Sequence, residues 1–158
     1  MLYPQNTSSR VCISLNGIWN FSLIGEQESY DPSVPLLNGQ PMPVPSAYND
    51  IYEGRAIHDH VGWVVYERTF DVPQAICSGT LMLRFSSVAH SAKVFLNGTL
   101  LGSHFGGFLP FEFDISSLVQ PVGNRLTVLV NNIVDHTTLP CGTIQTRCFP
   151  GMQPQTIN

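Results

Sequence analysis

Apolar and polar residues alternate along several short segments of this chain. Leu126, Val128 and Val130, for example, stand two residues apart, and the polar Thr127 separates the first two. In a β-strand such residues share one face, so this spacing is typical of strands that turn one face to a core. The alternation predicts strands over residues 15–23, 62–70, 81–85, 111–115 and 126–130.

The strongest local signal is the dipeptide Asn97-Gly98, which separates the apolar runs 92–96 and 99–101. Asn-Gly is favoured in two-residue hairpin turns because both central residues need a positive φ. We therefore expect a β-hairpin centred on these two residues.

Twelve prolines and thirteen glycines interrupt the chain and leave little room for a long helix. Five of the prolines fall between Glu26 and Tyr48, where few apolar residues recur at a regular spacing. We expect this segment to run over the surface as an irregular connection. Many short strands at this spacing predict an all-β fold of the jelly-roll β-sandwich type.

The pattern of the segment 62–70 predicts where two of its side chains point. Trp63 is placed inward on a central strand, as large aromatic residues on strands commonly are. Glu67 is placed outward, as a solvated carboxylate opposite apolar neighbours, and Glu112 and Asp114 on the segment 111–115 are treated in the same way.

The alternation stops after Asn131-Asn132, and the last residues are rich in Thr, Gln, Pro and Gly. No internal repeat and no shift in composition marks a second domain. We therefore expect one domain over residues 1–158, with an irregular tail from about residue 133 to residue 158.

Composition and charge exclude several classes of protein. The chain has 158 residues, is 43% hydrophobic and carries a net charge of −4, so it is neither disordered nor suited to a phosphate backbone. It has no apolar run of about 18 residues and no visible secretory signal. We expect a cytoplasmic protein with no nucleic-acid or membrane partner, and secretion of a longer parent protein stays open.

Several longer runs of the chain carry a further signal, namely residues 44–50, 60–68, 83–94, 97–98, 106–112, 124–128 and 131–140. In content and order these runs resemble the amino-terminal domain of the β-glucuronidases of glycoside hydrolase family 2. Together these matches span roughly residues 13–142.

The resemblance implies a galactose-binding-like jelly roll that serves as a sugar-binding domain. In the family this domain precedes an immunoglobulin-like domain and a barrel that carries two catalytic glutamates. This chain resembles the first part alone, so we expect a fragment that lacks the closing strand of the jelly roll and both other domains. Hydrolysis of β-D-glucuronosides, a step of carbohydrate metabolism, is expected of the full-length enzyme. A homo-oligomeric parent enzyme is a further expectation.

We expect no catalytic, cofactor-binding or metal-binding residue in this chain. Nothing in the spacing brings two carboxylates together for glycoside hydrolysis, and the cluster His58-Asp59-His60 is a weak metal signal that favours loop packing. The resemblance predicts contact with the missing barrel at Asp135, His136 and Thr138.

Two other functions remain open at this stage. The first is an autonomous carbohydrate-binding module without turnover, which rests on fold analogy. The second is a structural fragment that pairs with another chain through an exposed sheet edge.

Overall fold

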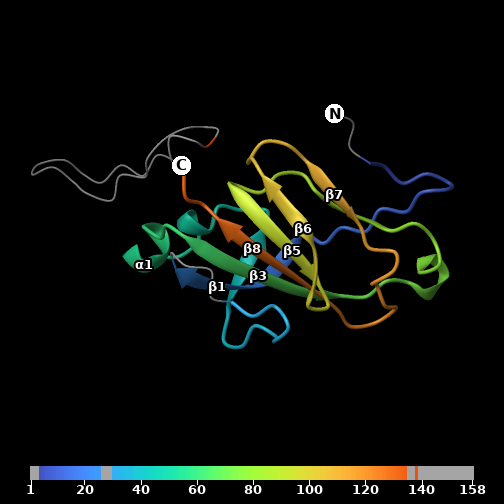
Figure 1. Ribbon diagram of the computed structural model, residues 1–158, viewed down its shortest axis with the longest axis horizontal. Coiled ribbons are helices and arrows are strands. Elements are labelled where there is room, and N and C mark those ends of the chain that lie inside the picture. The colour runs from blue at the N-terminus through green and yellow to red at the C-terminus, as the bar shows by residue number, and fades with distance from the viewer. Residues whose placement is uncertain (1–3, 26–29, 135–137, 139–158) are drawn as a thin grey trace, which may run out of the picture.

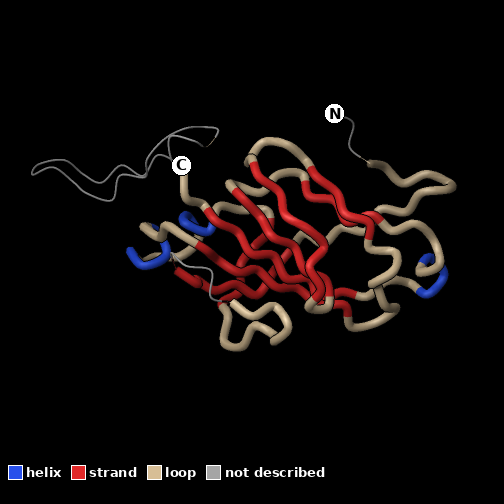
Figure 2. Tube along the Cα trace, viewed as in Figure 1, coloured by secondary structure: helices blue, strands red, loops and turns tan. Residues whose placement is uncertain are grey.

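The computed structural model describes residues 4–25, 30–134 and 138, and within them the regular secondary structure is almost all β-strand (Figures 1 and 2). The strands are β1 (Gly17–Gly25), β2 (Gln40–Val44), β3 (Trp63–Phe70), β4 (Met82–Phe85), β5 (Ser91–Leu96), β6 (Thr99–Phe105), β7 (Phe111–Asp114) and β8 (Asn124–Asn131). The helical segments are the short turns η1 (Tyr48–Asp50), α1 (Arg55–His58) and η2 (Gln74–Ile76).

The strands form two antiparallel sheets. Six strands make the large sheet in the order β2-β1-β3-β8-β5-β6, and β4 pairs with β7 in a small sheet. The small sheet packs against one face of the large one, which we call the inner face. The predicted all-β sandwich is confirmed, and the predicted strands correspond to β1, β3, β4, β7 and β8.

The main core fills the space between the two sheets. Alternate residues of the large sheet point inward, including Phe21, Val64 and Val128, and the small sheet contributes Leu83 and its neighbours. The sheets approach closely at Gly102 of β6, where an added Cβ would lie 2.6 Å from the ring of Phe113 on β7. A glycine is therefore required at this position of β6.

The hairpin between β5 and β6 has the predicted turn. Asn97 and Gly98 both adopt a positive φ, of 53° and 83°. The Asn97 side chain accepts a hydrogen bond from the Arg125 amide at 2.8 Å and donates one to the Leu118 carbonyl at 3.1 Å. The turn is thereby tied to β8 as well as closed locally.

The segment between Glu26 and Tyr48 differs from the expected irregular connection. Residues Gln40–Val44 form the edge strand β2, in which Pro41 pairs with Asn20 of β1. Pro41 and Pro43 lie two residues apart, so their ring nitrogens face the same side, and in an edge strand that side is the one away from the neighbour. The outward carbonyls accept hydrogen bonds from Tyr52 and Ser46. Prolines are compatible with a strand here because it lies at an edge.

The second face of the large sheet, which we call the outer face, is also apolar. Val65, Phe95 and Leu129 form a second buried cluster there. Trp63 packs against this cluster and is half-buried, with the Lys93 ammonium 5.4 Å from the ring centroid. The expectation that Trp63 points into the main core is wrong, because the period of two puts it on the same face as Val65.

Residues 30–36 cover part of the outer face, and Arg125 of β8 holds them there. Its guanidinium donates to the carbonyls of Pro32, Ser33 and Val34 at 2.8, 2.9 and 3.0 Å. It also forms a 2.9 Å ion pair with Glu67.

Glu67 is buried on this outer face. Its carboxylate accepts hydrogen bonds from the Leu36 amide at 3.0 Å and the Thr127 hydroxyl at 3.2 Å. The expectation of a solvated Glu67 is wrong, because the segment 30–36 covers a face that alternation alone leaves open to solvent. Glu112, by contrast, pairs with Arg84 at a more exposed position on the small sheet.

Glu67→Ala is expected to lower the free energy of unfolding by about 3–5 kcal/mol, because it leaves the buried Arg125 guanidinium without its counter-ion. Glu112→Ala is the matched control. It removes a more exposed glutamate from an arginine pair and is expected to cost at most about 1 kcal/mol. Urea unfolding of both variants measures the difference, and equal costs would contradict the assignment of the Glu67–Arg125 pair as the more buried of the two.

The two tryptophans provide a second test of the face assignment. Trp19→Ala empties a position in the main core and is expected to cost about 3–5 kcal/mol. Trp63→Ala removes a half-buried ring from the outer face and is expected to cost no more than about 2 kcal/mol. Chemical denaturation of both variants checks this order, and a larger loss for Trp63→Ala would reverse the assignment.

Candidate functional site

Four strands of the large sheet end side by side. Their register places Trp63 of β3, Asn131 of β8, Ser91 of β5 and Phe105 of β6 in one row across the sheet. The segments that continue from this row, namely residues 48–62, 87–90, 105–110 and 132–134, form what we call the exit end of the sandwich (Figure 1). The predicted contact residues follow directly from it along the chain.

A hydrogen-bonded network fixes one side of the exit end. Asn132 donates to the Tyr48 hydroxyl at 2.7 Å and to the His60 carbonyl at 3.0 Å, and its side-chain oxygen accepts from the Gly62 amide at 2.8 Å. The Tyr48 hydroxyl donates to the His60 carbonyl at 3.3 Å. The Asn132 side chain thus forms hydrogen bonds both with the residue before β3 and with Tyr48 of η1.

Burial shapes the chemistry of the tyrosines in this region. Burial raises the pKa of the Tyr48 hydroxyl from 10.0 to about 12, while hydrogen bonds from Asn49 and Asn132 lower it in part. Burial also raises the pKa of Tyr66, which faces the main core. Both phenols are neutral at neutral pH, and that of Tyr48 serves as a hydrogen-bonding group of the network.

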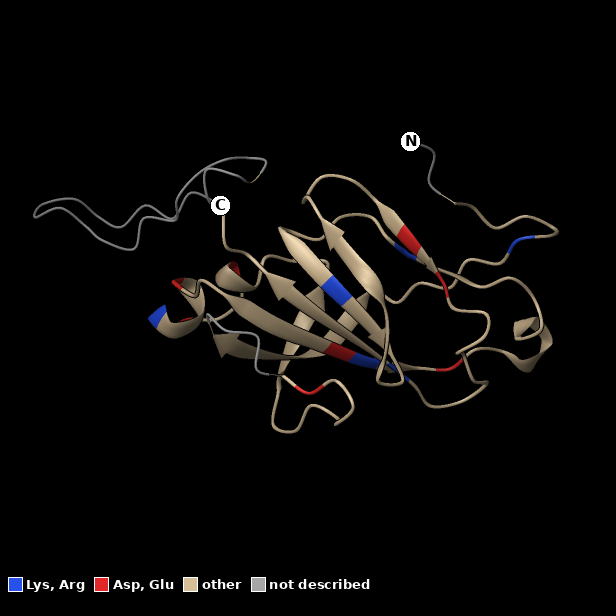
Figure 3. Ribbon diagram, in the orientation of Figure 1, with Lys and Arg blue, Asp and Glu red and all other residues tan. Residues whose placement is uncertain are grey.

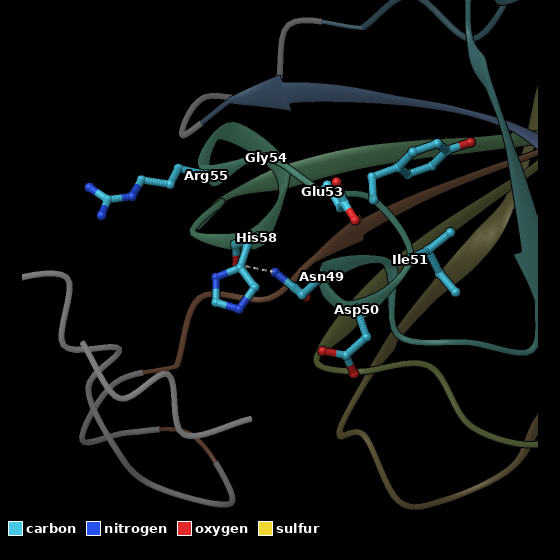
Figure 4. A pocket seen from close by; sticks show the side chains of 8 residues that line it. Asn49, Asp50, Ile51, Glu53, Gly54, Arg55 and His58 are labelled. Atoms are coloured by element: carbon cyan, nitrogen blue, oxygen red, sulfur yellow. Dashed lines mark hydrogen bonds between the residues drawn. The ribbon is translucent and has the colours of Figure 1, made fainter. Parts of the chain in front are cut away.

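An open hollow of about 580 Å³ lies beside this network, on residues 49–55 and His58. Figure 4 shows that its charged side chains do not converge: Arg55 points away from the fold, while Asp50 and Glu53 lie on different sides. Asn49 is committed to the loop, because its amide donates to the carbonyls of Ile57 and His58 at 3.2 and 2.8 Å. The polar side chains of the hollow therefore do not converge on one point where a ligand could bind.

The residues of the histidine cluster make separate local contacts. His58 pairs with Asp59 at 2.7 Å, whereas His60 contacts the Trp63 carbonyl at 3.1 Å. In the part of the chain that the structure describes, no three His, Cys, Asp or Glu side chains gather as metal ligands would. The Lys and Arg residues are spread over separate elements (Figure 3).

The carboxylates on the strands are likewise engaged separately. Glu67 pairs with Arg125 on the outer face, and Glu112 pairs with Arg84 on the small sheet. Asp114 accepts hydrogen bonds from the amide and hydroxyl of Ser116 at 2.9 and 2.6 Å, which lowers the pKa of its carboxyl. Glu67 thus lies on the large sheet, whereas Glu112 and Asp114 share one face of β7 but are engaged by different partners.

Of the predicted contact residues, Asp135 and His136 lie outside the described residues. Thr138 is described and is buried. The network around Asn132 was not anticipated as a site, because its partners lie 72 and 84 positions away in the chain. The one available signal was that Tyr48 and Asn132 both fall in runs that resemble the same family.

The comparison with family models decides the family. Residues 12–141 match the model described as glycosyl hydrolases family 2, sugar binding domain. The chain belongs to this family. The match covers all the strands of the sugar-binding domain described above.

Similar proteins are β-glucuronidases. The sugar-binding domain is 44% identical over 151 residues to the β-glucuronidase of Paenibacillus borealis, covering 92% of this chain and 25% of that protein. It superposes on a Bifidobacterium dentium β-glucuronidase complexed with coumarin-3-O-glucuronide with a TM-score of 0.87 and 46% identity, over 97% of this chain and 25% of that chain. A Faecalibacterium prausnitzii β-glucuronidase gives a TM-score of 0.86 at 43% identity, over 92% and 25% of the two chains.

The sugar-binding domain thus spans about a quarter of the length of these relatives. Among its described residues, no helix has the length and apolar character needed to cross a membrane.

The raised pKa of Tyr48 predicts a loss of stability at high pH. A folded-state pKa of about 12 against 10.0 means that Tyr48 contributes stability fully below pH 10, and that this contribution is lost as the pH rises towards 12. The Tyr48→Phe variant should show a shallower loss of stability across this range. Urea unfolding at several pH values measures the slope, and identical slopes in both proteins would contradict the assignment.

Proposed function

We propose that this chain is the sugar-binding domain of a β-glucuronidase-like enzyme of glycoside hydrolase family 2, and that it supports catalysis without carrying it out. The observation that carries the proposal is the family match over residues 12–141 together with relatives of about four times the length. In the complete enzyme the domain would buttress the catalytic barrel.

The arrangement of acids supports a non-catalytic role for the chain alone. Retaining glycosidases need two carboxyl groups about 5–5.5 Å apart. Glu67 pairs with Arg125 on the large sheet, and on β7 Glu112 pairs with Arg84 while Asp114 accepts a hydrogen bond from Ser116, so each carboxylate is engaged by its own partner. No cofactor is needed for this class of hydrolysis.

The proposed substrate of the complete enzyme is a β-D-glucuronoside. The support comes from the three relatives named above, which are β-glucuronidases and one of which is complexed with coumarin-3-O-glucuronide. Asp135, His136 and Thr138 are proposed to contact the catalytic barrel, since they follow directly from the exit end. The cytoplasmic location and the homo-oligomeric state of the parent stay predictions.

The test is a chimera in which residues 12–141 replace the matching segment of the Paenibacillus borealis β-glucuronidase. The chimera is expected to hydrolyse an aryl β-glucuronide, whereas the host enzyme without this segment and the isolated 158-residue chain are expected to release no product above the blank. Product release is followed by absorbance, with the intact host as the reference.

Two results would overturn the proposal. One is turnover that follows the isolated chain through size-exclusion chromatography, and the other is a folded chimera without activity. Tight binding of a free glucuronide by the isolated chain would favour the autonomous carbohydrate-binding module.

A further inference from the structure

The exit end carries an apolar surface that the fold itself does not use. Three large side chains at the end of β6 and in the loop that follows it are mostly exposed: Phe105 at 62%, Phe108 at 76% and Leu109 at 65%. Several exposed apolar residues so close along the chain are typical of an interaction surface, whereas apolar residues exposed singly are ordinary. We call these three residues the 105–109 patch.

The loop that bears the patch is fixed by its own contacts. The Gly106 amide donates to the His90 carbonyl at 2.9 Å, and His104 contacts the Gly106 carbonyl at 3.0 Å. Ser87 donates to the Gly107 carbonyl, and Gly107 lies so close to Ala89 that an added Cβ would be 3.2 Å from the Ala89 methyl. A loop held in this way loses little conformational freedom when a partner binds.

A buried polar group without a partner lies directly beside the patch. His90 is only 4% exposed, and its Nε2 has no hydrogen-bond partner in the structure. Native proteins pair almost all buried polar groups, so such a group calls for an explanation. The ring that lies against the imidazole is Phe105, edge to face at 4.6 Å between centroids.

Phe105 is therefore both the cover of His90 and a member of the exposed patch. Most of its side chain is in solvent while its ring lies against the His90 imidazole, so a partner that packs on Phe105 also comes close to the buried histidine. Each backbone group of His90 is already used, since its amide donates to the Asn131 carbonyl at 2.9 Å and its carbonyl accepts from Gly106. The imidazole alone is left for a partner.

We propose that the 105–109 patch and the His90 imidazole form the surface on which the remaining three-quarters of the β-glucuronidase polypeptide docks. The docked surface is apolar and carries one hydrogen-bonding side chain that pairs with His90 Nε2. This inference rests on the proposed function, because the relatives that the chain matches are about four times its length.

The position of the patch supports this occupant. Phe105, Ser91 and Asn131 lie in one row of the sheet, so the patch stands at the end where β8 ends and the chain continues towards Asp135 and Thr138. The patch and the predicted contact residues can therefore face the same body. A partner seated at the opposite end, by the Asn97-Gly98 turn, would reach neither.

Hydrogen exchange in the chimera described above tests the surface directly. The amides of residues 106–109 are expected to exchange at least about tenfold more slowly in the chimera than in the isolated 158-residue chain, because docking excludes water from them. Residues 36–38, which include the exposed Leu37, are the control and should exchange at equal rates in both proteins. Equal rates at 106–109 in a folded chimera would overturn the proposal.

The His90→Phe variant separates docking from a structural role. It replaces the unpartnered nitrogen with carbon, so the isolated chain should keep or raise its unfolding temperature, while the chimera should lose activity on heating at a lower temperature. A merely structural histidine would move both temperatures in the same direction, and that result would overturn the proposal.

The double variant Phe108→Ser with Leu109→Ser completes the test. In the chimera it should lower the temperature at which activity is lost. Leu37→Ser, at a similarly exposed apolar position away from the patch, should leave that temperature unchanged. An active chimera in which the double variant and the control behave alike would refute the docking surface alone. An inactive chimera that shows protection at residues 106–109 would refute the proposed function and leave the docking surface standing.

Discussion

The large sheet is apolar on both faces, and this constraint determines most of the structure. A sheet of six strands cannot leave Val64 and Val128 on one face, or Val65 and Leu129 on the other, in water without losing the burial that stabilises a domain. The small sheet of β4 and β7 covers the inner face. The outer face has no second sheet among the described residues, and a stretch of irregular chain covers it instead.

Irregular chain makes a poor cover unless its backbone polar groups are satisfied. Arg125 provides donors for three successive carbonyls of residues 32–34. Glu67 provides an acceptor for the Leu36 amide. Their charges compensate one another, so the pair can remain buried. One ion pair therefore replaces the hydrogen-bond ladder that a covering strand would have provided.

The sequence predicted the parts of this fold that depend on local pattern. Alternation located five of the strands, and Asn97-Gly98 located the hairpin, because face and turn chemistry are properties of neighbouring residues. The prediction for Glu67 was wrong because a period of two separates the faces of a strand but does not say that both will be covered. The prediction for Trp63 was wrong because it rested on the size of the ring, whereas the period of two places Trp63 on the face of Val65 and Glu67. The contact of Asn132 with Tyr48 joins residues 84 positions apart, and nothing in a single sequence records such a distance.

The prolines of β2 prevent that edge of the large sheet from pairing with another strand. Pro41 and Pro43 offer no N–H on that side, and the carbonyls of both residues are already occupied by Tyr52 and Ser46. A new strand arriving there would find neither donors nor vacant acceptors at these positions. If two copies ever joined their large sheets through the opposite edge at β6, the joined sheet would end in a proline-blocked strand on each side, so growth would terminate at a pair and could not continue into a fibre.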